Sequence, residues 1–174
     1  MQNDVKKIWN LMKMTNVTIA DLQEYCLNLG ISEKFPFKIF YTDKTQSDDV
    51  DFYQECETCY PVGVVIDNTV YTFPRYVDNR FCGDAETYCQ KRMGNNMKGT
   101  LPTRKQLEVL QANLEKYENI SAFLAYPKLS ECFKLCFAIA HSQNSQNTQY
   151  MYDFDKGEEI ATDSFSLVLP VINL

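Results

Sequence analysis

Histidine is almost absent from this chain of 174 residues, in which His141 is the only one. A single imidazole excludes His-rich metal clusters and leaves any Ser-His-Asp triad dependent on that one residue. The sequence also lacks a Gly-x-Ser-x-Gly elbow, a Walker loop and a Gly-x-Gly-x-x-Gly turn. Acyl transfer, nucleotide hydrolysis and dinucleotide redox chemistry therefore lack their usual frameworks. We expect a protein that is not an enzyme and holds no cofactor.

Long apolar runs are missing as well, because nowhere do about 18 apolar residues follow one another. The first ten residues carry Asp4, Lys6 and Lys7, where an export signal needs an apolar stretch. We therefore expect neither a membrane span nor a signal peptide.

The chain has seven cysteines, an odd number, so at least one is unpaired in any disulfide scheme. A chain of this length can close a core without disulfides. We expect reduced thiols and a cytoplasmic rather than a secreted protein.

Acidic residues outnumber basic ones by 23 to 17, which gives a formal net charge of -6. Such a chain repels a phosphate backbone unless its cations cluster, so nucleic acid is not an expected partner. Apolar residues make up 45% and charged residues 23% of the sequence, the balance of a soluble globular protein.

The first thirty residues carry the pattern of two short helices. Val5, Ile8, Trp9 and Met12 recur at helical spacing, and a second apolar face lies between Thr18 and Gly30. The polar, acidic segment 42–51 then predicts an exposed loop. We expect residues 1–60 to form a helical N-terminal extension with this loop, through which a homo-oligomer can assemble.

Strand patterns and helix signals alternate along the rest of the chain. Residues 35–41 predict a strand, and 61–66 with 70–73 predict a β-hairpin around Asp67-Asn68. Asp84 is placed to cap a helix over 85–93. A Thr103/Gln106 capping box opens a second helix, which buries Leu107, Leu110, Leu114 and Tyr117. Beyond Pro127, we predict strands over 133–140, 149–155, 158–162 and 165–172.

Several short segments resemble one family in both order and spacing. They are Ala85 with Tyr88-Cys89, Leu101-Pro102-Thr103 with Leu107, Tyr152-Asp153-Phe154 with Gly157, and Val168-Leu169-Pro170-Val171. The chain resembles bacterial C-type-lectin-like domains related to the C-terminal domain of the Legionella collagen-like protein. The resemblance implies an α+β fold over residues 61–174, with two helices packed on twisted antiparallel strands. Residues 136–141 depart from it, being apolar where the family is polar and aromatic.

The resemblance implies a non-enzymatic binding or adhesion module for protein or glycan ligands. The Glu-Pro-Asn, Gln-Pro-Asp and Trp-Asn-Asp boxes of calcium-dependent lectins are absent, so we expect binding without calcium. Asp153 and Asp155 share one strand face, which we interpret as an exposed acidic stripe. The alternative class is a structural or assembly component of a phage or mobile element.

The predicted ligand surface is the segment Ser142 to Tyr152. Its polar residues precede two tyrosines, a mixture that supplies adaptable hydrogen bonds and rigid contact area in recognition loops. The candidate ligand-binding residues are Asn144, Asn147, Gln149, Tyr150 and Tyr152. A solvated hairpin loop is the other interpretation of the same composition.

Cys56 and Cys59 form a Cys-x-x-Cys pair, the spacing of a redox pair or of half a zinc site. A second such pair is missing, and Glu55 and Glu57 beside it would raise the thiol pKa values. We therefore predict no metal site, and keep a small zinc or redox protein that uses these two cysteines as a further alternative to plain thiols.

Overall fold

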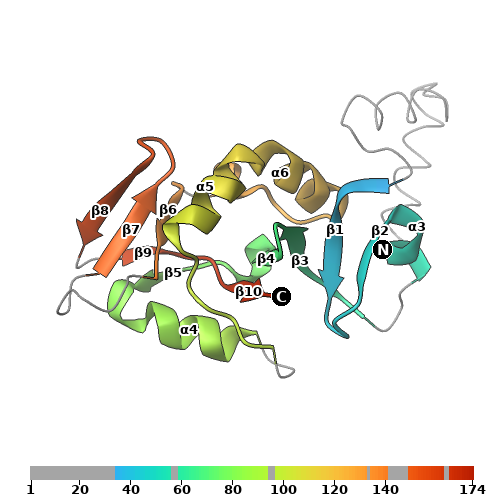
Figure 1. Ribbon diagram of the computed structural model, residues 1–174, viewed down its shortest axis with the longest axis horizontal. Coiled ribbons are helices and arrows are strands. Elements are labelled where there is room, and N and C mark those ends of the chain that lie inside the picture. The colour runs from blue at the N-terminus through green and yellow to red at the C-terminus, as the bar shows by residue number, and fades with distance from the viewer. Residues whose placement is uncertain (1–33, 56–58, 94–96, 133, 141–148, 163–164) are drawn as a thin grey trace.

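The computed structural model describes residues 34–55, 59–93, 97–132, 134–140, 149–162 and 165–174. The two predicted N-terminal helices, and with them the proposed oligomerising extension, lie outside these ranges. Within them the chain forms two five-stranded sheets and several short helices. The expected α+β class is therefore confirmed (Figure 1).

The first sheet is antiparallel throughout and has the order β10-β4-β3-β1-β2. Its strands are β1 (Lys34–Tyr41), β2 (Gln46–Asp49), β3 (Pro61–Ile66), β4 (Thr69–Thr72) and β10 (Val171–Asn173). The predicted hairpin is confirmed, since Asp67 and Asn68 link β3 to β4 with φ of 47° and 59°. Both residue types tolerate the left-handed region that a tight hairpin turn requires.

The segment before β3 belongs to this same sheet. β1 pairs with β3 on one side and with β2 on the other. The prediction that 42–51 is wholly an exposed loop is wrong, because β2 occupies 46–49 and α3 (Val50–Glu55) follows it. The predicted domain boundary between residues 60 and 61 passes through the sheet.

The second sheet has the order β5-β9-β6-β7-β8. Its strands are β5 (Asp78–Phe81), β6 (Cys136–Ala138), β7 (Gln149–Asp153), β8 (Glu158–Thr162) and β9 (Phe165–Val168). All pairs are antiparallel except β6 with β9. A turn joins β7 to β8, and Gly157 has φ of 67° there.

The C-terminal segment, predicted as one strand over 165–172, divides between the two sheets. β9 ends at Val168 and β10 begins at Val171, with Leu169 and Pro170 between them. Phe165 is 64% exposed, whereas Leu167, Leu169 and Val171 are buried. The hydroxyl of Thr72 donates to the carbonyl of Pro170 at 2.7 Å, which ties β4 to this crossing.

The helices and 3-10 turns fill the connections between strands. They are η1 (Pro74–Tyr76), η2 (Cys82–Asp84), α4 (Ala85–Arg92), α5 (Arg104–Ala112), α6 (Leu114–Phe123) and α7 (Leu129–Cys132). The Thr103/Gln106 capping box is confirmed at the start of α5. The single helix predicted after it is divided at Asn113, and the unpredicted α7 stands directly before the segment 133–140 that we expected to be a strand.

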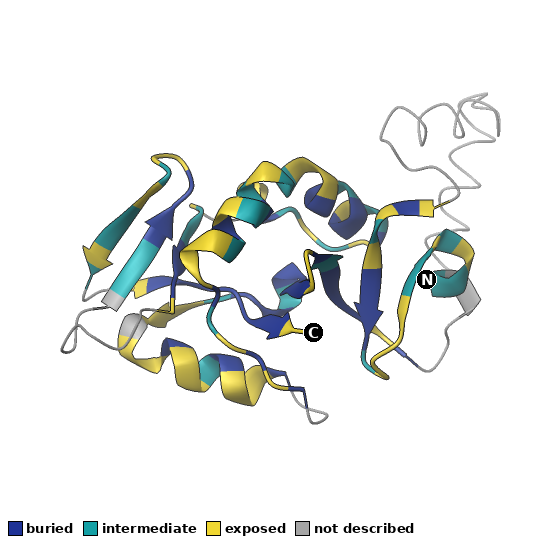
Figure 2. Cartoon of the chain, in the orientation of Figure 1, coloured by how far each residue is buried: buried dark blue, intermediate teal, exposed yellow. Residues whose placement is uncertain are grey.

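The main core lies between α5–α6 and the strands. Leu107, Leu110, Tyr117 and Ile120 are completely buried. The Tyr117 hydroxyl donates to the carbonyl of Thr72 at 2.7 Å and so satisfies its only donor. Figure 1 shows α5 and α6 along one side of the molecule and α4 along the other, with strands between them. Figure 2 shows buried residues on these strands and a largely exposed α4.

Candidate binding surface

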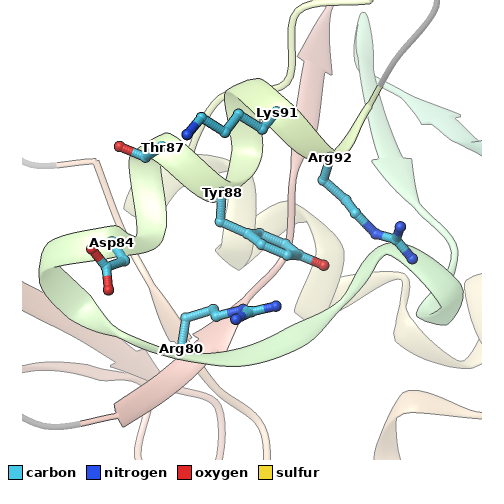
Figure 3. A pocket seen from close by; sticks show the side chains of 6 residues that line it. All are labelled: Arg80, Asp84, Thr87, Tyr88, Lys91 and Arg92. Carbon is cyan, nitrogen blue, oxygen red and sulfur yellow. The ribbon is translucent and has the colours of Figure 1, made fainter.

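A surface groove of about 380 Å³ lies between β5 and α4, which are consecutive in the chain and joined by η2. Its lining consists of Arg80, Asp84, Thr87, Tyr88, Lys91 and Arg92 (Figure 3). Only Tyr88 among these is half-buried, and the other five are exposed. The groove therefore presents charged and hydrogen-bonding groups to solvent.

Helix α4 has two unlike faces. Tyr88, Lys91 and Arg92 are spaced three and four residues apart and share the groove face, as helical geometry requires. Ala85 and Cys89 lie on the adjacent strip of the helix, are completely buried and pack with Ala138 and Val168, and Tyr88 borders this cluster. The small buried residues hold the helix against β6 and β9, which leaves the long side chains free to line the groove.

The middle of the groove is organised around the ring of Tyr88. Its hydroxyl donates to the carbonyl of Tyr76 at 2.8 Å, and the Arg80 guanidinium carbon lies 4.9 Å from its ring centroid. Asp78 holds Arg80 through an ion pair of 2.6 Å. Burial raises the pKa of the Tyr88 phenol, while the charges of Arg92 and Arg80 act in the opposite direction. The ring and the guanidinium are thus fixed before a ligand arrives.

Positive charge accumulates at the Arg92 end. Arg92 Nη2 donates to the carbonyl of Arg75 at 2.9 Å, and the guanidinium carbons of Arg75 and Arg92 lie 4.6 and 5.9 Å from the centroid of Tyr76. Among the described residues, none of Arg75, Lys91 and Arg92 has a salt-bridge partner. Nε of Arg75 is buried without a hydrogen-bond partner in that part of the chain. In a chain of net charge -6, these uncompensated cations suit an incoming anionic group.

Two exposed aromatic rings lie outside the groove, where β5 ends and β9 begins. Phe81 and Phe165 face each other across β5 and β9, with ring centroids 6.0 Å apart, and are 46% and 64% exposed. A β-carbon added to Gly83 would lie 3.4 Å from the Phe81 ring. Neither ring lines the groove, since Phe81 follows Arg80 in β5 and successive side chains of a strand point to opposite faces of the sheet.

The predicted loop residues have different outcomes. Asn144 and Asn147 lie outside the described residues, and only the backbone of Gln149, in β7, is described. Tyr150 is half-buried, and its carbonyl accepts from the N–H of Ile139 at 3.1 Å. The structure does not bring these residues into the groove.

Tyr152 corrects the prediction that it is exposed in this loop. It is 2% exposed, and its hydroxyl donates to Oε1 of Gln111 at 3.1 Å. Its ring packs edge-on against Phe154, with centroids 5.7 Å apart. Tyr152 is therefore a core residue that offers no surface to a ligand.

The cysteines also depart from the expectation of reduced thiols. Cys59 is buried and disulfide-bonded, and Cys56 lies outside the described residues. A disulfide-bonded Cys59 supplies no thiolate to zinc. Cys89 and Cys136 are free, and burial raises the pKa of the Cys89 thiol to about 12. Within the described ranges, no three His, Cys, Asp or Glu side chains gather closely enough to hold a metal ion.

Asp153 is likewise not part of an exposed stripe, because it is 2% exposed. Its Oδ1 accepts from the backbone N–H groups of Asp155 at 2.9 Å and Lys156 at 3.3 Å. Desolvation acts to raise its pKa, but the N–H groups of Lys156 and Asp155, the Cys136 thiol and the Lys134 charge together hold the pKa below its usual value. The carboxylate thus stabilises the turn between β7 and β8.

No family model matches the chain, and a search of curated proteins finds no match either. No helix in the described ranges is long and apolar enough to span a membrane.

The sequence alone did not single out the groove residues, because an exposed, charged helix face is common in globular proteins. The available signal was the helical spacing of Tyr88, Lys91 and Arg92, which places two cations and an aromatic ring on one face.

Proposed function

We propose that the chain is a C-type-lectin-like module that binds a protein or glycan ligand at the α4–β5 groove, without catalysis and without calcium. The strand order supports the fold part of this proposal, because the last strand, β10, returns to pair with β4 of the first hairpin. Helices α4 and α5–α6 cover the strands from two sides (Figure 1). The Leu-Pro-Thr segment stands directly before α5, as the resemblance implies.

The observation that carries the binding proposal is the set of uncompensated cations at the groove. Repulsion between like charges disfavours such a cluster, and the bond from Arg92 to the carbonyl of Arg75 neutralises none of that charge. A ligand with anionic groups removes this repulsion on binding. The fixed ring of Tyr88 and the ion-paired Arg80 reduce the ordering cost that such a ligand has to overcome.

The test is a screen of the full chain against glycan and protein arrays with three sets of variants. The groove variant carries Lys91→Gln and Arg92→Gln. The loop variant changes Asn144, Asn147, Gln149 and Tyr150 to Ala. The control carries Lys105→Gln and Lys116→Gln, two exposed positions on α5 and α6 that alter the net charge by the same amount.

We expect the groove variant to lose the ligand and the control to keep it. A ligand lost only by the loop variant would move the site to the predicted loop. A chain that binds no array component contradicts the binding function itself. Binding that is abolished by a calcium chelator contradicts calcium independence.

A further inference from the structure

We propose that the groove binds a segment of a partner protein that carries charges of both signs. Its acidic side chains face Lys91 and Arg92, and a basic side chain, about four residues away, faces Asp84. This inference rests on the proposed function and narrows its ligand to one class. Its basis is the arrangement of these three charged residues along the groove lining.

The two signs of charge lie in different parts of the groove. Asp84 stands directly before α4, whereas Lys91 and Arg92 occupy its last turn. Figure 3 shows Asp84 at one end and Arg92 at the other, with the ring of Tyr88 between them. Among the described residues, none of these three charged side chains has a salt-bridge partner. Each can therefore pair with an opposite charge that a ligand supplies.

The separation of these charges sets the spacing in the ligand. A helix rises about 1.5 Å per residue, so Asp84 and Arg92 are separated by about 12 Å along the axis of α4. An extended peptide covers that distance in about four residues. The carboxylate of Asp84 makes no capping bond to α4 and repels acidic side chains at its end of the groove. The acidic residues of the ligand are thereby restricted to the opposite end.

The need for both signs of charge favours a protein over a glycan partner. Acidic saccharides carry carboxylate or sulfate groups, and the amino groups of common saccharides are acetylated and uncharged, so such a glycan supplies no cation to Asp84. A peptide supplies carboxylates and ammonium or guanidinium groups within a few residues. Binding of acidic motifs by clustered cations is a recurring mode of peptide recognition. The groove, at about 380 Å³, has room for the few side chains of a short segment.

The helix dipole favours the same distribution of charge, negative at the start of α4 and positive at its end. That effect stabilises the folded chain without a ligand, so it changes the free energy of unfolding and not the choice of peptide. The test therefore measures ligand selection. Glu86 provides the matched control, because it is an exposed acidic residue in the first turn of α4 but does not line the groove.

The experiment selects random decapeptides from a display library on the immobilised full chain and on two charge variants. On the parent chain we expect enrichment of peptides with Asp or Glu and, about four positions away, Lys or Arg. On Asp84→Lys the selected peptides should keep the acidic residues and lose the basic preference. On Glu86→Lys, the control, they should be the same as those selected on the parent.

The affinities of the selected peptides are then measured with purified variants. These peptides should bind Lys91→Gln/Arg92→Gln about tenfold more weakly than the parent. They should bind Lys105→Gln/Lys116→Gln within twofold of the parent. Their affinity should fall as the salt concentration rises, because exposed charges make the contacts.

Four outcomes overturn the inference. They are enrichment of peptides without acidic residues, a basic preference that is absent on the parent or survives in Asp84→Lys, equal binding by Lys91→Gln/Arg92→Gln and its control, and failure to enrich any peptide. Polygalacturonate, a polyanion without amino groups, serves as the second probe. If it binds the parent and loses affinity for Lys91→Gln/Arg92→Gln while no peptide is enriched, the protein class is wrong and the proposed binding function stands.

Discussion

Helices α4 and α5 cover the strands from opposite sides, but α5 belongs to the main core and α4 is largely exposed. α5 begins with a complete capping box and buries Leu107 and Leu110. α4 begins at Asp84 without a side-chain capping bond and buries only Ala85 and Cys89. The capping box and the apolar residues of α5 therefore specify a helix that packs into the main core. The residues of α4 contribute little to the core and line the groove, which is the arrangement expected of a functional surface on a stable framework.

The largest expected difference between the two helices is in the free energy of unfolding. Leu107→Ala leaves a cavity in the main core and should lower that free energy by about 3 kcal/mol. Thr87→Ala, on the exposed groove face of α4, should change it by less than about 0.5 kcal/mol. Urea unfolding followed by circular dichroism measures both. Equal losses would show that α4 is as much a part of the core as α5.

The next effect concerns how α4 is held. A β-carbon at Gly99 would lie 2.6 Å from the carbonyl oxygen of Cys89, so this segment approaches α4 too closely for any side chain. Gly99→Ala should therefore cost about 2 kcal/mol, a typical overpacking penalty. It should also weaken ligand binding by displacing the groove face. The free energy of unfolding and the affinity are measured on the same preparation, and an unchanged value of both would contradict the close packing.

Capping gives a smaller contrast between the same helices. Thr103→Ala removes the hydroxyl that accepts from the N–H of Gln106 and should cost about 1 kcal/mol. Asp84→Ala removes no capping bond and should cost only a few tenths of a kcal/mol. Both are read from urea unfolding. A larger loss for Asp84→Ala than for Thr103→Ala would show that Asp84 stabilises the start of α4.

Acid sensitivity should be found away from both helices, at the turn after β7. The pKa of Asp153 lies below its usual value in the folded state. Its contribution to stability is therefore complete above about pH 4, the range of an unfolded Asp, and is lost as the pH falls through the lower folded value. The parent should lose more stability than Asp153→Asn as the pH is lowered. Parallel curves for the two proteins would exclude this carboxylate as a source of acid sensitivity.

Local signals in the sequence predicted the elements that they encode directly. Asp67-Asn68 fixed the β3–β4 hairpin, and Thr103 with Gln106 fixed the start of α5. The pairing of strands that are distant in the sequence could not be predicted from such local signals. Nothing around Leu169-Pro170 indicates that β9 and β10 enter different sheets.

The candidate site was harder to predict for the same reason. Tyr152 resembles a loop tyrosine in sequence, but it is buried where its hydroxyl reaches Gln111 of α5 and its ring packs on Phe154. Arg80 and Lys91 resemble ordinary surface charges until β5, η2 and α4 bring them to one groove. The absence of carboxylate partners, which marks the site among the described residues, is a property of the folded chain.

The most direct test of this account compares Lys91→Gln/Arg92→Gln with Lys105→Gln/Lys116→Gln. Both variants are titrated in one series with a ligand that the array screen identifies for the parent chain. Each pair removes two positive charges from exposed helix positions. The account predicts that both variants keep the parent's free energy of unfolding within about 1 kcal/mol, and that only the α4 variant loses affinity, by about tenfold. Equal affinities for the two variants, or an equal loss in both, would contradict the assignment of the α4–β5 groove as the binding site.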